Sequence, residues 1–239
     1  SIRRQRQMCI RDRHCITRKG AGYKFSEEGN PAQWHAPGIF NKLTGEIVKI
    51  APAASIPPKY QDVFGHTIVE LAEKNEKIMG ITPAMPSGCS LNIMMKAMPN
   101  RAFDVGIAEQ HATTAAAGMA MGGLRPVIAV YATFLNRAFD QVSFDVALHE
   151  QPVFFCIDRA GITGPDGASH HGLLDMVLLT KVPGMTMFAP SSYQELQQMF
   201  SDALKITSGP VAIRYPRTPA PSVPETEVGS GLNARMVSE

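Results

Sequence analysis

The chain has 239 residues, a hydrophobic content of 44% and a formal net charge of +2. The length allows one or two domains, the composition is that of a globular protein with a real core, and the small charge neither favours nor excludes a polyanionic partner. Because no apolar run approaches the roughly 18–20 residues of a membrane span, we expect no membrane partner. We expect no nucleic acid as partner either.

The four cysteines are Cys9, Cys15, Cys89 and Cys156. No two of them form a CxxC pair, and Cys156 lies within an apolar run expected to be a buried strand. Free, partly buried thiols are typical of a reducing compartment, so a cytoplasmic location is expected. The same spacing gives no reason to expect a structural metal site.

Composition along the chain predicts one folded domain with flanking segments. Residues 1–18 are polar and basic without helical or strand periodicity, and are expected to be a disordered or artefactual leader. Prolines and glycines scattered among polar residues predict an irregular connector over 19–59. Residues 60–219 are expected to form the folded domain, and the polar, Gly- and Ser-containing stretch 220–239 is typical of a linker.

Within the expected domain, helical and strand patterns alternate. Helical spacing of apolar residues predicts helices at 60–75, 90–98, 109–122, 134–149, 173–181 and 193–206. Short apolar runs predict strands at 77–81, 102–105, 126–131, 152–157, 185–189 and 210–215. Strands that are apolar on both faces and joined by helices indicate a parallel sheet covered on both sides. We therefore expect a three-layer α/β domain with about six mostly parallel strands.

Ligands of such sheets bind beyond the carboxyl ends of the strands, and polar side chains follow several of the predicted strands. The first is Glu109, which opens a helix of small residues within 103–118 (FDVGIAEQHATTAAAG). A helix-start acid stabilised by the helix dipole is one interpretation. The other is a buried carboxylate that hydrogen-bonds a ligand nitrogen and exchanges a proton with it.

An aromatic and basic group follows the next strand, at 131–137 (YATFLNR). Phe134 is either a core residue or a flat platform for a ligand ring, and Tyr131 lies at the same strand end. Arg137 either faces solvent or pairs with Asp140.

The loop at 158–172 (DRAGITGPDGASHHG) is too polar for packing and too rich in functional side chains for a plain connector. Arg159 is a candidate clamp for a phosphate, and His170 a candidate proton shuttle. His171 is expected to be structural. A solvated loop without a ligand is the alternative.

The segment 214–217 (RYPR) follows the last predicted strand and carries Arg214 and Arg217. Either or both are candidates to bind an anion, and a surface ion pair is the simpler interpretation.

Taken together, residues 19–219 resemble the middle of the bacterial 1-deoxy-D-xylulose-5-phosphate synthase family. The resemblance rests on five motifs in the family's order and spacing: ITPAM at 81–85, FDVGIAEQHA at 103–112, YATFLNRAFDQV at 131–142, the loop at 158–172 and RYPR at 214–217. IAEQH alone would indicate only the wider transketolase group. The resemblance implies that 60–219 is a pyrimidine-binding domain of a thiamine-diphosphate enzyme.

For the cofactor, the resemblance implies that Glu109 pairs with the aminopyrimidine ring nitrogen of thiamine diphosphate and that Phe134 stacks on that ring. For the substrates, it implies that the phosphate of glyceraldehyde 3-phosphate is bound by Tyr131, Arg159 and Arg214. Asp166 and His170, with Glu109, would be the catalytic residues. The activity would be condensation with pyruvate to 1-deoxy-D-xylulose 5-phosphate and CO2, a precursor step for isoprenoids, thiamine and pyridoxal.

Two departures from the family pattern matter. The family binds the cofactor diphosphate and Mg²⁺ through a GDG motif and a later Asn in an earlier domain, and no GDG occurs here. Residues 19–59 resemble only the tail of that domain, and 220–239 would begin the linker to a C-terminal domain. We therefore expect a central fragment that binds thiamine diphosphate weakly and does not turn over alone, from a protein that is a homodimer at full length.

Three alternatives stay open at this point. The chain could come from a transketolase or from the β-subunit of a 2-oxoacid dehydrogenase, which share the fold group but use other substrates. A third alternative, of another class, is a non-catalytic α/β module whose rim holds an anionic ligand. Arg159 and Arg214, with the loop that contains Asp166 and His170, favour the synthase.

Overall fold

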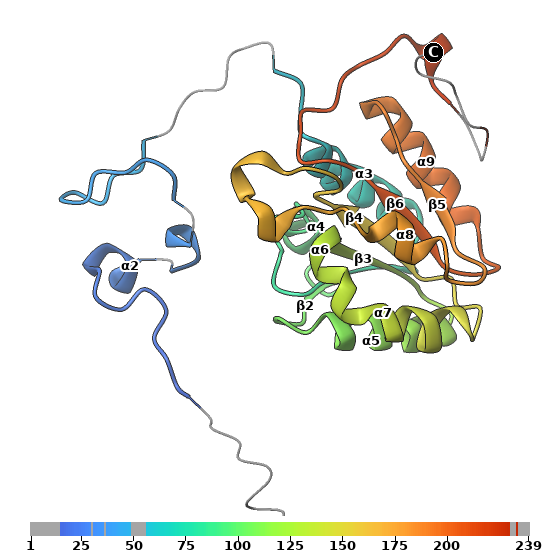
Figure 1. Ribbon diagram of the computed structural model, residues 1–239, viewed down its shortest axis with the longest axis horizontal. Coiled ribbons are helices and arrows are strands. Elements are labelled where there is room, and N and C mark those ends of the chain that lie inside the picture. The colour runs from blue at the N-terminus through green and yellow to red at the C-terminus, as the bar shows by residue number, and fades with distance from the viewer. Residues whose placement is uncertain (1–14, 30, 36, 49–55, 230–232, 234–239) are drawn as a thin grey trace, which may run out of the picture. The chain divides into compact units, whose positions relative to one another are not determined.

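The computed structural model describes residues 15–29, 31–35, 37–48, 56–229 and 233, and the chain divides into two compact units, Ser1–Ala54 and Ser55–Glu239 (Figure 1). Apart from residues 15–18, the leader expected at 1–18 lies outside the described residues, as do 230–232 and 234–239 of the expected linker. Within the described part of the chain, no helix is both long and apolar enough to cross a membrane.

The first unit contains one short α-helix, α2 (Lys24–Glu28), and a 3-10 turn, η1 (Pro31–Trp34). Packing of aromatic rings holds it together. The Trp34 ring meets the Tyr23 ring at 5.0 Å and the Phe40 ring at 5.2 Å, both nearly edge-on, and the indole N–H of Trp34 donates to the Phe25 carbonyl at 3.1 Å. The other described residues of this unit lie in turns, bends, segments without regular structure and an isolated bridge between Phe40 and Ile47, which suits a connector rich in glycine and proline.

The second unit is built on a six-stranded sheet in which every neighbouring pair is parallel, in the order β2-β1-β3-β4-β6-β5. The strands are β1 (Ile78–Thr82), β2 (Ala102–Asp104), β3 (Arg125–Tyr131), β4 (Phe154–Asp158), β5 (Thr186–Phe188) and β6 (Val211–Arg214). Tyr131 pairs with Asp158, so β3 and β4 end side by side at the centre of the sheet.

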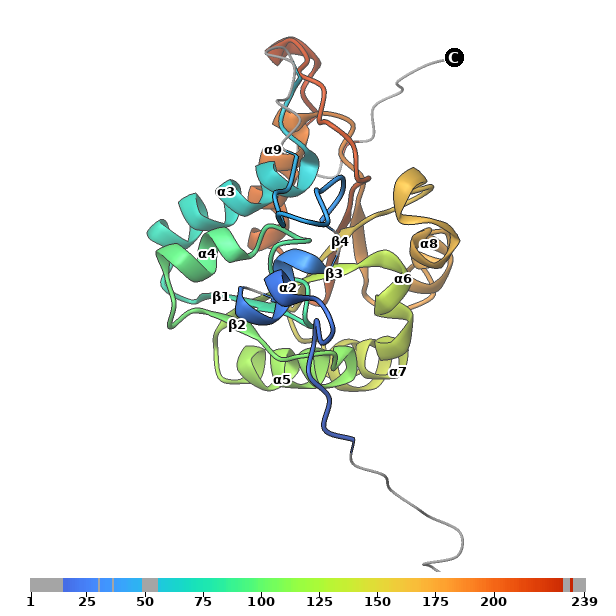
Figure 2. The ribbon, with the colours of Figure 1, turned by 90° about the vertical axis from the view of Figure 1, so that its left-hand side faces the viewer.

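Helices cover both faces of this sheet, which confirms the expected three-layer α/β domain (Figures 1 and 2). On one face lie α3 (Tyr60–Lys74), α4 (Asn92–Ala97) and α9 (Tyr193–Lys205). On the other lie α5 (Glu109–Met121), α6 (Ala132–Leu135), α7 (Phe139–Gln141) and α8 (Asp175–Leu179).

The sequence dictates how closely each helix packs. In α3, Tyr60, Val63, Phe64 and Ile68 recur every three or four residues and are buried, which puts them on one face of the helix. In α5 the buried side chains are mostly alanines, which let the helix lie close to β1 and β3. Phe200 of α9 fills the layer between α3 and the sheet.

The segment expected to be one helix at 134–149 is helical but divided. It runs through α6, a 3-10 turn η2 (Asn136–Ala138), α7 and a π-helical turn η3 (Val142–Ala147). Ala138, the last residue of η2, has φ −111° and ψ 15°, outside the α region, and α7 begins at the next residue. Phe134 in α6 contacts Tyr131 at the end of β3, and Arg137 in η2 contacts Glu109 at the start of α5.

Candidate functional site

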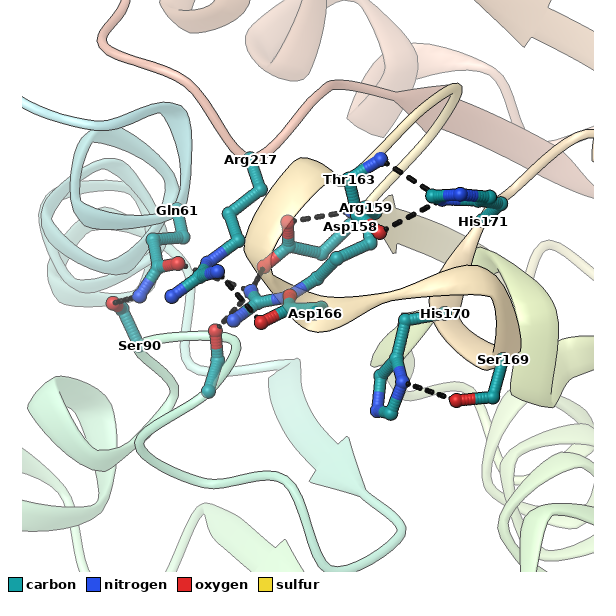
Figure 3. Close-up of polar contacts among 11 residues, drawn as sticks. Gln61, Ser90, Asp158, Arg159, Thr163, Asp166, Ser169, His170, His171 and Arg217 are labelled. Atoms are coloured by element: carbon teal, nitrogen blue, oxygen red, sulfur yellow. Dashed lines mark hydrogen bonds and ion pairs between the residues drawn. The ribbon is translucent and has the colours of Figure 1, made fainter. Parts of the chain in front are cut away.

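The carboxyl ends of β3 and β4 carry most of the predicted site residues. Tyr131 ends β3, Asp158 ends β4, and Arg159 follows at once. The loop after β4 folds back over these ends through two short 3-10 turns, η4 (Gly164–Asp166) and η5 (Ala168–His170) (Figure 3). Chemistry-bearing side chains from distant parts of the sequence therefore meet at one edge of the sheet.

Glu109 opens α5 and has 6% of its surface exposed. Its carboxylate lies 3.6 Å from Nη1 of Arg137, a side chain that is 58% exposed. The Glu109 carboxylate makes this ion pair but accepts no hydrogen bond from the described residues. A buried carboxylate without a hydrogen-bond partner is suited to receive the N–H or ring nitrogen of a ligand.

A cluster of aromatic rings lies next to Arg137, the ion-pair partner of Glu109. The rings of Tyr131 and Phe134 are stacked, with centroids 5.8 Å apart and planes 19° apart. The His170 ring meets Phe134 edge-on at 5.4 Å, and its Nδ1 lies 3.0 Å from the Ser169 hydroxyl. The guanidinium carbon of Arg137 lies 5.5 Å from the Phe134 centroid. Phe134 is thus the shared neighbour of Tyr131, His170 and Arg137.

Arg159 is 5% exposed and held on several sides. Its Nη1 donates to Asp158 Oδ2 at 2.6 Å, to the Gly88 carbonyl at 2.6 Å and to Gln61 Oε1 at 3.0 Å. The guanidinium carbon also lies 4.0 Å from the centroid of the Tyr131 ring, a cation–π contact. These contacts fix the plane of the guanidinium.

Asp166 lies between two arginines, as Figure 3 shows. Its Oδ1 accepts from Arg217 Nη1 at 2.6 Å, and its Oδ2 is 3.4 Å from Arg159 Nε. The second contact is an ion pair without a hydrogen bond, because both Arg159 Nε and Asp166 Oδ2 lack a hydrogen-bond partner among the described residues. One carboxylate therefore links the loop after β4 to the segment after β6 and brings two arginines to the same place.

Arg214 lies elsewhere. Its Nε donates to Asp175 Oδ2 at 2.6 Å, and Asp175 is a buried acid at the start of α8. Of the two arginines in the RYPR segment, Arg217 therefore joins the Asp166 cluster and Arg214 joins α8. That Arg214 binds phosphate stays a prediction.

The loop over the site is closed at its base. Gly161 and Gly172 exchange backbone hydrogen bonds of 2.8 Å in each direction, and a Cβ at Gly172 would lie 2.4 Å from the Ala132 Cβ. His171 Nδ1 accepts from the Thr163 N–H at 3.1 Å, a contact that suits the structural role expected for this histidine. The loop is anchored on both sides, which holds Asp166 and His170 over the strand ends.

Burial shifts the proton affinities at the site. It raises the pKa of Asp158 to about 7, although the charge and hydrogen bonds of Arg159 act in the opposite direction. It also raises the pKa of the Tyr131 phenol, again against the effect of Arg159. Tyr131 therefore stays neutral and keeps a hydroxyl that can donate a hydrogen bond.

Three residues in this arrangement are absent from the sequence-based predictions: Gln61, Gly88 and Asp158. Gln61 and Gly88 contact Arg159 across 98 and 71 positions of sequence, a separation at which spacing carries no signal. Asp158 is an acid at the end of an apolar strand. That placement is the one signal that pointed to it.

Comparisons with known proteins agree with this geometry. Residues 57–222 match the family model described as "Transketolase, pyrimidine binding domain". The 1-deoxy-D-xylulose-5-phosphate synthase of Chlorobaculum tepidum is 56% identical over 95% of this chain and 34% of its own length, and that of Cytophaga hutchinsonii is 54% identical over 85% and 32%. The chain thus spans about a third of the length of these curated relatives.

A solved structure titled "Split gene transketolase, inactive beta4 tetramer" also matches. It has a TM-score of 0.63 and 29% identity, and covers 72% of this chain and 56% of that one.

Proposed function

We propose, since this chain belongs to the transketolase pyrimidine-binding domain family, that it is part of an enzyme that condenses pyruvate with glyceraldehyde 3-phosphate to 1-deoxy-D-xylulose 5-phosphate and CO2. The observation that carries the proposal is the pairing of two features at one sheet edge. One is the buried Glu109 carboxylate, linked to the Phe134 ring through Arg137, and the other is the arginine pair around Asp166. High identity to named synthases adds support.

The residues present fit the pyrimidine ring of thiamine diphosphate. Glu109 offers a buried carboxylate that lacks a hydrogen bond among the described residues, and Phe134 offers a half-buried ring at the same edge. Glu109 would hold a proton at its carboxylate and exchange it with the ring nitrogen. Thiamine diphosphate, when bound, supplies the electron sink for decarboxylation of a 2-oxo acid. We propose that the diphosphate and Mg²⁺ are held by residues outside this sequence, which has no GDG motif.

The arginines suit the phosphate of the acceptor. Arg159 has its plane fixed by Tyr131 and its Nη1 occupied. Its Nε makes no hydrogen bond to the described residues and only an ion pair with Asp166 Oδ2 at 3.4 Å, so this is the side that would meet an oxyanion. Arg217 adds a second charge across Asp166. We propose that Tyr131, Arg159 and Arg217 bind the phosphate, with Arg214 retained as a candidate whose present partner is Asp175.

Asp166 and His170 are proposed to contact the reacting groups. The His170 ring contacts Tyr131 and Phe134, and its Nδ1 lies 3.0 Å from the Ser169 hydroxyl, which places an imidazole at the edge where the substrates would bind. Asp166 would orient Arg159 and Arg217 as well as polar groups of the substrates.

Ketol transfer is the second candidate function. It is favoured by the 29% identity to the chain titled as a split-gene transketolase, over 72% of this chain. We place it second because identity to the named synthases reaches 54–56% over 85–95% of this chain. A 2-oxoacid dehydrogenase β-subunit or an anion-binding module has no such specific support.

The choice of donor separates the two candidates. The experiment uses the complete protein. It therefore includes any regions that correspond to the two thirds of the relatives that this chain does not match. With glyceraldehyde 3-phosphate and thiamine diphosphate fixed, pyruvate is compared with a ketose phosphate as donor. The proposal predicts product from pyruvate with release of CO2. Product from the ketose phosphate alone would favour ketol transfer.

We also propose that the complete protein is a cytoplasmic homodimer. Buried free thiols at Cys89 and Cys156 support a reducing location. Exposed apolar side chains near α8, at Leu173, Leu174 and Val177, support a covering partner. Light scattering after size exclusion tests the dimer.

A further inference from the structure

Asp158 lies at the centre of the site and has no role in the function proposed above. It is fully buried at the end of β4. Its Oδ1 accepts from the backbone N–H of Arg159 at 2.6 Å, and its Oδ2 accepts from Arg159 Nη1 at 2.6 Å. One carboxylate thus holds both the backbone and the guanidinium of the next residue, as Figure 3 shows.

This double contact depends on an unusual backbone conformation. Arg159 has a φ of +60°, in the left-handed region that residues other than glycine seldom occupy. Such a conformation persists only where surrounding contacts determine it, and such residues gather at ligand sites. Here the backbone turn brings the arginine side chain back onto the carboxylate that precedes it.

The contacts on Arg159 are unequal around the guanidinium. Nη1 has three acceptors, from Asp158, Gln61 and Gly88, whereas Nε has no hydrogen-bond partner among the described residues. The Nε side makes an ion pair with Asp166 Oδ2 at 3.4 Å, without a hydrogen bond. Because one end of the group is anchored and one face lies on Tyr131, the Nε side has a defined direction.

We propose that Asp158 is a positioning residue, which anchors Nη1 of Arg159 so that the opposite side of the guanidinium is presented to the phosphate of the acceptor aldehyde. The inference rests on the proposed function and deepens it, since it assigns to Asp158 the selectivity for a phosphorylated acceptor. Asp158 acts through Arg159 and touches no substrate. Gln61, from α3, is the second anchor of the same nitrogen.

The test measures acceptor preference, which a merely structural residue would not change. In the complete protein with pyruvate and cofactor, kcat/KM is compared for glyceraldehyde 3-phosphate and for D-glyceraldehyde, which lacks the phosphate. Asp158→Asn keeps the size of the side chain but replaces one accepting oxygen with an amide N–H₂. The preference for the phosphorylated acceptor is expected to fall about tenfold or more, through a higher KM, with D-glyceraldehyde kinetics little changed.

Tyr215→Phe is the matched control. Tyr215 is fully buried, lies near Asp158 and carries a hydroxyl without a hydrogen-bond partner among the described residues. Its removal perturbs the same part of the core without touching Arg159, so the preference should stay at the wild-type value. If both variants lose preference equally, general loosening explains the effect and the inference is overturned.

A second variant covers the case in which Asp158→Asn does not fold, as judged by circular dichroism. Asp158→Glu keeps the charge but moves it by one methylene, which displaces Nη1 and should also lower the preference. An unchanged preference in the folded variant overturns the inference while the proposed function stands. A wild-type complete protein that forms no 1-deoxy-D-xylulose 5-phosphate overturns both.

Discussion

Arg217 Nη1 donates to Asp166 Oδ1 at 2.6 Å, and this ion pair ties the segment after β6 to the loop after β4. The pair lies three residues along the chain from a second one, between Arg214 and Asp175. Two arginines in one short motif thus have different surroundings: one shares an acid with Arg159 and the other shares an acid with α8.

This difference predicts that replacing Arg217 will affect substrate binding, whereas replacing Arg214 will affect stability. Arg217→Met should raise the KM for glyceraldehyde 3-phosphate about 10- to 100-fold, because a charge-assisted contact to the phosphate is lost. Arg214→Met should instead lower the free energy of unfolding by about 3 kcal/mol, since Asp175 is left buried without its cation. Steady-state kinetics and denaturant unfolding of both variants check this. A KM effect confined to Arg214→Met would reverse the assignment.

Glu109→Gln should abolish most activity and leave the fold intact. The amide cannot exchange a proton as the acid does, which costs at least about 100-fold in rate. Stability should change little, because the 3.6 Å contact of Glu109 with the exposed Arg137 is weak. Turnover and melting temperature are measured together. Glu73→Gln, the same change on the exposed side of α3, is the control, and near-normal turnover in Glu109→Gln would remove Glu109 from its role.

Gly172→Ala should destabilise the loop base. A Cβ there would lie 2.4 Å from both the Ala132 Cβ and the Arg159 carbonyl oxygen, so the backbone must shift, at about 1–3 kcal/mol. Gly118→Ala in α5 meets nothing within 4 Å and should stabilise by roughly 0.5–1 kcal/mol. Unfolding free energies of the two variants test the pair. Equal effects would show that the base of the loop is not tightly packed.

The pH dependence of stability should reveal the buried carboxyl group of Asp158. Its folded-state pKa of about 7 lies above the ordinary 3.8, so the folded state binds this proton more tightly. The stability it contributes is fully present below about pH 4 and is lost as the pH rises through about 7. The free energy of unfolding of wild type, minus that of Asp158→Asn, should therefore fall between about pH 4 and 8.

Denaturant unfolding over this pH series is the measurement, and a difference that rises with pH contradicts the account. The ionisable groups that interact electrostatically with Asp158 are Arg159, Arg217, Tyr131, Tyr215, Cys89 and Cys156. Burial raises the pKa of the two tyrosines and the two cysteines, so these four stay neutral over the range and do not obscure the result.

The sequence was sufficient for the sheet and for the edge at which the site lies. Each buried strand is a short apolar run, and the carboxyl ends of parallel strands share one edge, so Glu109, Tyr131 and Arg159 were expected to converge there. The division of 134–149 was not foreseen. It depends on the backbone of one residue, Ala138, and an apolar period of 3.6 continues across that break.

The contacts of Arg214 and Arg159 could not be predicted from the sequence, because they depend on how distant segments pack together. Arg214 is the last residue of β6, and side chains along a strand alternate between the two faces of the sheet. Whether it meets an acid therefore depends on α8, which starts at Asp175, 39 positions earlier. The anchors of Arg159 come from α3 and from the segment before α4. Such contacts follow from tertiary packing.

The most direct test of the central claim follows carbon from pyruvate into the product. The complete protein is given pyruvate labelled with carbon-13 at its ketone carbon, glyceraldehyde 3-phosphate, thiamine diphosphate and Mg²⁺, and the products are identified by nuclear magnetic resonance. The account predicts label in the ketone carbon of 1-deoxy-D-xylulose 5-phosphate, equimolar CO2, and loss of both in Glu109→Gln. Absence of a labelled pentulose phosphate from the wild-type protein would contradict it.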